Sequence, residues 1–313
     1  MNRFFTGLQP EDILLTGASG FIGSYVNETL AYRCVIAVRK ELPNINNSKQ
    51  VKLSELLESK QFIHLFDSTK VVIHLANLAH AKHYDAEELK RVNVDNTLEL
   101  ARRAAKSNVK RFVYVSSIVV NGSTKLGIPF NSKSEASPSN DYAKSKYEAE
   151  SGLLKIAEET GLEVVIIRPT LVYGHRAPAN VGSLIHLVKC SPVLPFGSVT
   201  NKRDFIAVQN LADLLLVCAE HPNAANQIFL ASDCKAVSTK DFTNAIAQGL
   251  DKSLIQLPIP VSLMKLSARL AGKSAMAEHL LGNLQVDSSN TQAVLDWIPP
   301  YTMKQVMASL SEN

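Results

Sequence analysis

The sequence predicts an α/β fold: a Rossmann domain with a doubly wound parallel sheet, joined to a smaller, interleaved C-terminal substrate domain. Two observations predict this class. Short apolar runs alternate with longer helical patterns through residues 1–170, and a glycine-rich turn directly follows the first apolar run. Alternating strands and helices favour a parallel sheet whose sequential crossovers are right-handed. Val71–Leu75 shows little polar alternation, as expected of a strand covered on both faces.

Each element of the first half follows from a local pattern. A strand is expected where a short apolar run lies between turns, and a helix where apolar residues recur with the helical period. Gly161 ends the last of these helices, because glycine readily adopts a left-handed C-cap. The predicted strands are Ile13–Leu15, Cys34–Val38, Val71–Leu75, Phe112–Val115 and Val164–Ile167. The predicted helices run from the glycine turn through Leu30, over Glu87–Lys106 and over Asp141–Thr160.

The pattern loosens after Pro169. Strands are expected at Arg203–Val208 and Gln227–Leu230, Asn210 as the cap of a short helix, and Ser238 with Asp241 as a capping box. Two further helices are expected at Val261–Leu270 and Asn290–Asp296. We therefore expect residues 1–170, with return segments near 203–235, to form the NAD(P)-binding domain. Residues 171–202 and 236–313 would form the substrate domain, with the ligand cleft outside the carboxyl ends of the strands.

Composition excludes several classes of protein. The chain has 313 residues, of which 46% are hydrophobic and 20% charged, and its net charge of +4 is interspersed rather than gathered in a basic patch. No apolar run approaches the ~18 residues that span a bilayer, and Met1–Pro10 has no signal-peptide core. We therefore expect a cytoplasmic protein with no nucleic-acid and no membrane partner. The four cysteines are expected to be buried thiols rather than disulfides or zinc ligands.

The segment Thr16–Gly23 predicts a dinucleotide-binding turn. Gly17 permits a tight turn, Gly20 lets the backbone approach a pyrophosphate, and Gly23 lets the helix pack closely on the sheet. The helix N-terminus would offer free N–H groups to the phosphates. Residues expected to contact the cofactor here are Gly17, Ser19, Gly20, Phe21, Ile22 and Gly23. An ordinary tight turn is the alternative.

The residue that closes the second strand bears on the choice of cofactor. An acid there would accept a hydrogen bond from a ribose hydroxyl of NAD, but the sequence has Arg39, followed by Lys40. A guanidinium can pair with a 2′-phosphate, which favours NADP(H) over NAD(H). A solvent-exposed basic pair is the alternative.

Tyr142 and Lys146 are four residues apart and share one face of a predicted helix. A free phenol has a pKa of ~10, and a nearby ammonium together with an oxidised nicotinamide would favour the phenolate that a proton transfer needs. Ser116 and Ser117 end a predicted strand at the edge where ligands bind, and we expect Ser117 to hydrogen-bond the same substrate oxygen. A Tyr-x-x-x-Lys pair on a helix surface is common, but here the glycine turn, the serines and the pair occur in one order.

This order resembles the extended short-chain dehydrogenase/reductases, specifically the NAD-dependent epimerase/dehydratase family and its UDP-glucose 4-epimerase-like and UDP-4-keto-sugar reductase branch. The resemblance covers essentially the whole chain. The matching stretches are Thr16–Gly23, His74–Ala76, Asn93–Thr97, Tyr114–Ser117, Tyr142–Lys146, Arg168–Gly174, Arg203–Ile206 and Val286–Ser289, with Trp297 and Pro299.

The resemblance implies a role for particular residues. Ser117, Tyr142 and Lys146 would form the catalytic triad, with Lys146 also holding the nicotinamide ribose. Asn180 and Arg203 would meet the nucleotide-sugar diphosphate or its ribose. The further residues implied at the cofactor are Leu75, Ala76, Asn93, Ser116 and Pro169. A homodimer is implied as well, formed through the helix after Asn93 and the Tyr142 helix.

The implied activity is hydride transfer at C4 of a UDP-hexose or UDP-N-acetylhexosamine by an epimerase or a 4-ketoreductase. Arg39 and Leu171 depart from the typical sugar epimerase, and no clear Asp-Leu or Asp-Ile for the adenine occurs around Val51–Ser54, which favours the ketoreductase. Ile118 and Val119 stand where a dehydratase would carry an acid pair. Two alternatives stay open: an NADPH-dependent reductase of a non-sugar ketone, and a non-catalytic dinucleotide-sensing protein. His74, His80 and His83 lie close in sequence but have no fitting partners, so no metal is expected.

Overall fold

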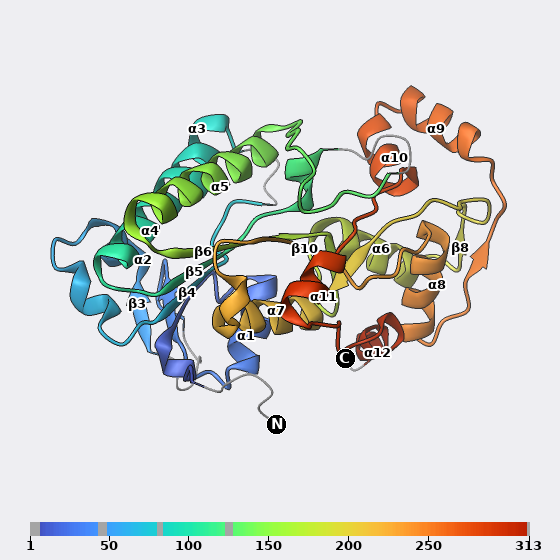
Figure 1. Cartoon of the computed structure of the whole chain (residues 1–313). Coiled ribbons are helices and arrows are strands. Elements are labelled where there is room, and N and C mark those ends of the chain that lie inside the picture. Colours follow the sequence, from blue (N-terminus) through green and yellow to red (C-terminus); the bar gives the residue numbers. More distant parts are fainter. Residues whose placement is uncertain (1–6, 43–48, 80–83, 123–127, 312–313) are drawn as a thin grey trace.

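The computed structural model describes the chain except for residues 1–6, 43–48, 80–83, 123–127 and 312–313. Its largest element is a seven-stranded parallel sheet with the order β10-β6-β5-β4-β1-β2-β3 (Figure 1), which confirms the predicted fold class. The strands are β1 (Ile13–Thr16), β2 (Val35–Val38), β3 (Gln50–Lys52), β4 (Val71–His74), β5 (Arg111–Val115), β6 (Glu163–Pro169) and β10 (Ile228–Ala231). The strand order reverses between β1 and β4, and ligands bind at such points at the carboxyl ends of the strands.

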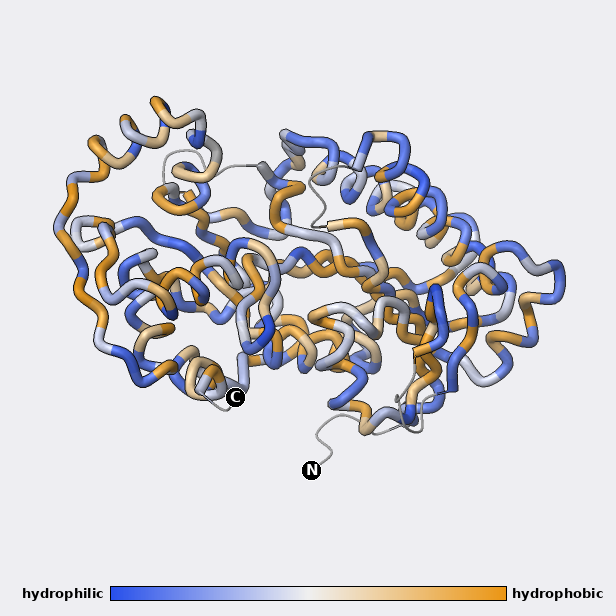
Figure 2. The backbone as a smooth tube through the Cα atoms, turned by 180° about the vertical axis from the view of Figure 1, so that it is seen from behind, coloured by the Kyte–Doolittle hydropathy of each residue, from blue (hydrophilic) through white to orange (hydrophobic). Residues whose placement is uncertain are grey.

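Helices cover both faces of the sheet, so neighbouring residues of β1 pack into different cores (Figures 1 and 2). Leu14 belongs to one apolar cluster with Leu100 and Leu153, whereas Leu15 belongs to the opposite cluster with Leu214. Burial on both faces is why the strands are apolar throughout. The first face is covered by α2 (Leu53–Glu58), α4 (Asn96–Lys106) and α5 (Asp141–Thr160), and the second by α1 (Phe21–Thr29), α7 (Val208–Glu220) and α11 (Ser289–Leu295).

The other elements surround a third apolar cluster beside the sheet. At its centre the rings of Phe205 and Phe242 stack with centroids 4.1 Å apart, and Tyr173 lies edge-on to both. Ser238 caps α8 by accepting a hydrogen bond from the backbone of Asp241, as predicted. The elements are β7 (Leu171–Tyr173), α6 (Ala179–Cys190), β8 (Val193–Leu194), β9 (Phe205–Ala207), α8 (Thr239–Gly249), β11 (Ile255–Gln256), α9 (Val261–Leu270), α10 (Ser274–Leu281) and α12 (Met303–Ala308).

Two sequence-based expectations about helices are wrong in detail. The helix expected over Glu87–Lys106 is divided into α3 (Ala86–Leu89), a π-helical turn over Lys90–Asp95 and α4. Asn210 does not cap α7 but lies in its buried first turns, because its amide donates to Asp233 and to the carbonyl oxygen of Tyr301. In both places a tertiary contact outweighs the local preference.

The four cysteines divide into two buried and two exposed thiols. Cys34 and Cys218 are buried, and burial raises the pKa of the Cys34 thiol to about 12. The expectation of burial is wrong for Cys190 and Cys234, which are exposed: Cys190 is the last residue of α6, and Cys234 follows the end of β10.

None of the described helices is both long and apolar enough to cross a membrane.

Candidate functional site

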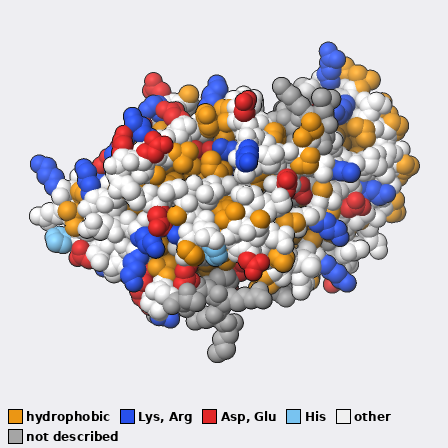
Figure 3. Space-filling view, viewed as in Figure 1, with side chains coloured by type: hydrophobic (Ala, Val, Ile, Leu, Met, Phe, Trp, Pro, Cys, Tyr) orange, Lys and Arg blue, Asp and Glu red, His pale blue; other side chains and the backbone are white. Residues whose placement is uncertain are grey.

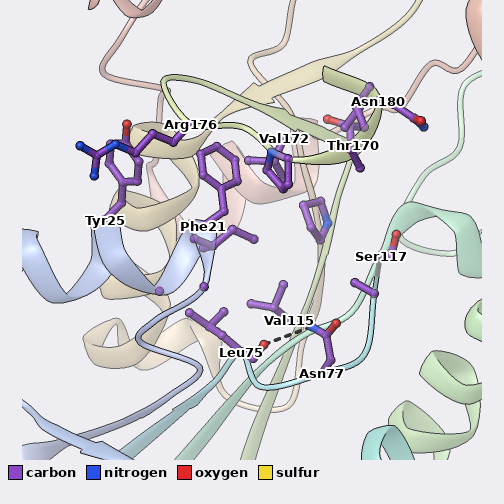
Figure 4. A pocket seen from close by; sticks show the side chains of 18 of the residues that line it. Phe21, Tyr25, Leu75, Asn77, Val115, Ser117, Thr170, Val172, Arg176 and Asn180 are labelled. Atoms are coloured by element: carbon purple, nitrogen blue, oxygen red, sulfur yellow. Dashed lines mark hydrogen bonds between the residues drawn. The ribbon is translucent and has the colours of Figure 1, made fainter. Parts of the chain in front are cut away.

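A cavity of about 1850 Å³ opens at the carboxyl ends of the strands, between the sheet and the third cluster. Its wall combines the turn after β1, the ends of β4, β5 and β6, and residues of α6 and α10 (Figure 4). Most of the residues predicted to bind cofactor or substrate line it: Gly17, Ser19, Gly20, Phe21, Ile22, Gly23, Arg39, Leu75, Ser116, Ser117, Tyr142, Pro169, Asn180 and Arg203. Ala76, Asn93 and Lys146 lie behind this wall rather than in it.

The glycine turn is as compact as its sequence predicts. Gly17 has a φ of +73°, and a Cβ there would lie 2.8 Å from the backbone nitrogen of Ala76. A Cβ on Gly23 would collide with the carbonyl oxygen of Gly17. Helix α1 begins after Gly20 with no side-chain cap and no acidic residue in its first turn. Its first N–H groups therefore suit the diphosphate of a dinucleotide.

Thr16 and His74 fasten the turn to β4. Thr16 Oγ1 accepts hydrogen bonds from the backbone of Leu75 and of Ala76, both at 3.1 Å, and lies 2.8 Å from His74 Nδ1. The Thr16 hydroxyl therefore donates to Nδ1, which leaves Nε2–H to donate to Thr97 Oγ1 at 3.0 Å. Burial, with the charge of Lys146, lowers the pKa of His74 to about 3. His74 is thus a neutral structural residue.

Lys146 is fully buried behind the cavity. Its ammonium donates to the carbonyl oxygen of Val115 at 2.7 Å and lies 4.4 Å from the centre of the Tyr114 ring. Burial lowers the pKa of Lys146 to about 7, and Glu150, one turn further along α5, acts in the opposite direction. The cation is therefore held next to the strand that ends at Ser116.

The lowered pKa expected for Tyr142 depends on an oxidised nicotinamide as well as on Lys146, and it stays a prediction. Burial raises the pKa of its phenol to about 12, and the ammonium of Lys146 is directed at Val115 instead. The cause is desolvation, which disfavours the charged phenolate. Tyr142 lines the cavity wall, where its phenol can exchange a proton with a bound ligand.

The two serines differ in their surroundings. Ser117 is half-buried, caps the short helical turn Ile118–Asn121 and accepts a hydrogen bond from Val119 at 3.4 Å. Ser116 is buried, and its hydroxyl has no hydrogen-bond partner among the described residues. Both residues line the cavity, and the Ser117 hydroxyl can serve a bound polar group there, whereas the Ser116 oxygen is itself buried.

A hydrogen-bond chain supports α5 from behind. Asn93 Oδ1 accepts from the backbone of Leu78 at 2.8 Å, and its amide donates to Ser145 Oγ at 3.1 Å. Ser145 in turn donates to the carbonyl oxygen of Tyr142 at 2.8 Å. Asn93 lies in the π-helical turn, which turns its side chain toward α5. It therefore acts on the backbone that carries Tyr142 rather than on a ligand.

Sequence reasoning missed a second buried support. Arg168 donates to Glu150 Oε1 at 3.0 Å and to Asn121 Oδ1 at 3.1 Å, and all three side chains are buried. The pair ties α5 to β6 at the cavity floor. Glu150 and Arg168 are both charged residues within otherwise buried stretches, and that was the signal available in the sequence.

The far end of the cavity is formed by residues from distant parts of the chain. Arg203 is buried and donates to the carbonyl oxygen of Gly282 at 2.9 Å, while Asn180 is exposed in the first turn of α6. Figure 4 shows Thr170 and Asn180 together on one side of the cavity and Leu75 and Asn77 on the opposite side. Sequence reasoning missed the lining residues Asn77, Tyr84, Thr170, Arg176, Met276 and His279.

Among the described residues, no group of three or more His, Cys, Asp and Glu side chains could hold a metal ion. His80 and His83 lie outside the described residues.

Comparison with known proteins gives consistent results. The family model described as "NAD dependent epimerase/dehydratase family" matches residues 13–231. A UDP-glucose 4-epimerase of Vibrio cholerae is 42% identical over 95% of this chain and 93% of its own. An N-acetyl-α-D-glucosaminyl-diphospho-ditrans,octacis-undecaprenol 4-epimerase of Escherichia coli O157:H7 is 24% identical over 94% and 92%. In fold, the crystal structure of a UDP-N-acetylglucosamine 4-epimerase from Bacillus cereus matches 96% of this chain and 98% of its own, with a TM-score of 0.79 and 18% identity.

Proposed function

The chain belongs to the NAD dependent epimerase/dehydratase family, and from this premise we propose that it epimerises C4 of a UDP-hexose or UDP-N-acetylhexosamine. The observation that carries the proposal is the 42% identity to a UDP-glucose 4-epimerase along nearly the whole of both chains. The cavity supports it, because Tyr142 and Ser117 line a space large enough for a dinucleotide and a nucleotide sugar.

We propose NAD(H) or NADP(H) as the cofactor, held by the glycine turn and the first turn of α1. When bound, the dinucleotide would supply the hydride chemistry of the reaction at C4. Arg39 lines the cavity and is exposed, so its guanidinium can meet a 2′-phosphate, which favours NADP(H). Ser116, with its unpartnered hydroxyl, and Pro169 would lie along the same groove.

Tyr142 would exchange a proton with the C4 oxygen of the sugar, while Ser117 donates a hydrogen bond to the same atom. Loss of the hydroxyl proton and of hydride from C4 gives a 4-keto sugar. Return of hydride to the opposite face, with the proton from Tyr142, gives the epimer. Lys146 would stabilise the phenolate form of Tyr142 during the reaction. Because the pKa of Lys146 is lowered to about 7, its amine would gain or lose a proton readily near neutral pH.

The substrate would lie toward α6 and α10. We propose that Asn180, in the first turn of α6, and Arg203 bind the diphosphate or the ribose of UDP. Residues 171–202 and 236–313 would then form the substrate domain, as the sequence predicts. The homodimer through α4 and α5 likewise stays a prediction, which light scattering checks.

Cofactor retention followed by turnover tests the proposal. Protein purified without added nucleotide is denatured, the released molecule is identified by mass spectrometry, and UDP-glucose and UDP-N-acetylglucosamine are followed by NMR. Retained NAD with formation of the C4 epimer supports the epimerase. Failure to bind either dinucleotide contradicts the proposal.

The second candidate is a 4-ketoreductase, which the exposed Arg39 in the cavity favours because a reductase consumes NADPH in each turn. An empty protein that prefers NADPH and forms no epimer without added reductant would support it.

A further inference from the structure

Helix α9 carries an outward-facing row of leucines. Leu263, Leu266 and Leu270 are 54%, 53% and 82% exposed, and no residue of α9 is buried. At about 100° per residue these three lie within about 60° of one another, roughly opposite the face formed by Val261, Met264 and Ala268 that packs against the third cluster. The helix therefore has two apolar faces, and only one of them contacts the protein.

The charged residues of α9 itself are basic, and Glu278 of α10 is their acidic neighbour. Residues 252–277 contain four basic residues and no acidic one. Arg269 lies about 60° from Leu266 around α9, Lys265 lies between Arg269 and the packed face, and Lys273 comes three residues after the last residue of the helix. Lys265 is 3.4 Å from Glu278, but both side chains are about half exposed, so this ion pair is weak.

The apolar surface continues beyond α9. Ile255 and Met276 are 60% and 56% exposed in the same segment. An apolar groove of about 580 Å³ lies under α9, lined by Phe196 and Ile259 among others. In Figures 1 and 3 this region forms the end of the molecule farthest from β3, with hydrophobic and basic side chains side by side on its surface.

We propose that α9 and the adjoining residues of 255–276 dock the protein on the surface of an anionic lipid bilayer. Exposed leucines flanked by lysine and arginine are the features that place a helix in the plane of a membrane interface. A second copy is a poorer occupant, because a symmetric contact would bring the basic residues of both copies together. The expectation of no membrane partner rests on the lack of a spanning segment, which a helix lying on the surface does not need.

Docking at α9 would also place the large cavity near the lipid. Met276 and His279 of α10 line that cavity, and α10 packs directly against α9. The docking surface itself does not depend on the proposed function, since it contains none of the residues assigned to proton transfer.

Vesicle flotation of the full chain tests the proposal. Vesicles of phosphatidylcholine alone are compared with vesicles that contain about 30% phosphatidylglycerol, at low and at raised salt. We expect at least about tenfold more protein bound to the anionic vesicles, and loss of most of that binding at raised salt. The triple variant L263S/L266S/L270S is expected to reduce binding at least about tenfold, and K265E/R269E/K273E likewise.

The matched control is Ile63→Ser, since Ile63 is 51% exposed in the turn Phe62–Phe66 of the other half. Ile63→Ser should bind like the unchanged protein, and the thermal unfolding of every variant should match it. No binding to anionic vesicles, or equal binding by the leucine variant, would overturn the proposal. A dimer that the leucine variant converts to a monomer, seen by light scattering without any vesicle binding, would assign the surface to a second copy instead.

Discussion

Lys146 and Val115 are joined by a hydrogen bond of 2.7 Å from the ammonium to the backbone carbonyl oxygen. Val115 is the last residue of β5 and is followed by Ser116 and Ser117, while Lys146 lies one turn after Tyr142 on α5. This bond therefore fixes the helix that carries the phenol against the strand that carries the hydroxyls. Because the bond is buried, it holds the two elements in register without exposure to water.

Tyr142→Phe is expected to lower kcat of the proposed epimerase by about 10²- to 10⁴-fold, because it removes the group that exchanges a proton with the substrate. Dinucleotide binding should persist. The measurement is the rate of interconversion of the C4 epimers, with Kd for the cofactor from fluorescence titration. Tyr147→Phe is the control, since Tyr147 is exposed on the same helix. A fully active Tyr142→Phe protein would refute the assigned role.

Lys146 should make stability rise with pH above neutrality. Its pKa of about 7 in the folded protein lies below the ordinary 10.5, so between these values the unfolded chain binds a proton that the folded protein has released. The contribution of Lys146 to the free energy of unfolding then increases with pH, by at most about 1.4 kcal/mol per pH unit. The raised thiol pKa values of the buried Cys34 and Cys218 act in the opposite direction as the pH approaches 9, equally in the unchanged protein and in a Lys146 variant. Lys146→Met should lose this increase between pH 7 and 9.5. Urea denaturation at several pH values measures it.

Two features keep the Lys146 experiment specific. Tyr142, with a pKa raised to about 12, begins to act in the opposite direction only above pH 10, outside the measured range. Lys144→Met is the matched control, because Lys144 is exposed on the same helix. An equal pH dependence in the unchanged protein and in Lys146→Met would contradict the lowered pKa.

Arg39→Ala should weaken NADP binding by about tenfold or more and leave NAD binding nearly unchanged, because only NADP carries a 2′-phosphate for the guanidinium to meet. Isothermal titration with both dinucleotides measures the two Kd values. Lys40→Ala controls for general loss of positive charge, since Lys40 is exposed but does not line the cavity. Equal weakening of both cofactors would remove the argument for NADP.

The features that the sequence predicted well depend on local patterns. The segment Thr16–Gly23 has glycines at positions where a side chain would collide, and these glycines predict its turn. Buried strands are predicted by their apolar runs. Strand β3 was missed because Gln50–Lys52 is three residues long and only Val51 is buried. A short edge strand of this kind has no periodicity that sequence reasoning could detect.

The rest of the site depends on distant contacts. Met276 and Thr170 meet in one cavity although more than a hundred residues separate them, and nothing in either segment indicates the other. Spacing reveals a lysine near Tyr142 but not the burial that raises the pKa of its phenol. Asn210 was assigned to a cap for the same reason, since Asp233 and Tyr301 come from other elements.

Gly23→Ala should abolish dinucleotide binding and destabilise the fold, because the new methyl group would meet the carbonyl oxygen of Gly17 inside the turn. Overpacking of this kind typically costs about 1–3 kcal/mol, and backbone atoms on both sides limit relaxation. Thermal unfolding and cofactor titration measure the two effects. Gly7→Ala is the control, because a Cβ on Gly7 would meet no atom within 4 Å. A normal affinity for the cofactor in Gly23→Ala would show that the turn is not its binding site.

His74 should make the protein lose stability in mild acid. Its pKa of about 3 in the folded state lies below the ordinary 6.5, because burial between Thr16 and Thr97 disfavours the charged ring. As pH falls from 6.5 toward 3, His74 binds a proton in the unfolded chain but stays neutral in the folded protein. The free energy of unfolding therefore decreases. In His74→Gln that part of the decrease should vanish, although the variant starts from a lower stability because the two hydroxyls lose a matched partner.

Denaturation between pH 7 and 4.5 gives the slopes, and His64→Gln, at an exposed histidine, should keep the slope of the unchanged protein. Identical slopes in the unchanged protein and in His74→Gln would mean that His74 is protonated in the fold, and the hydroxyl of Thr16 could not then donate to it.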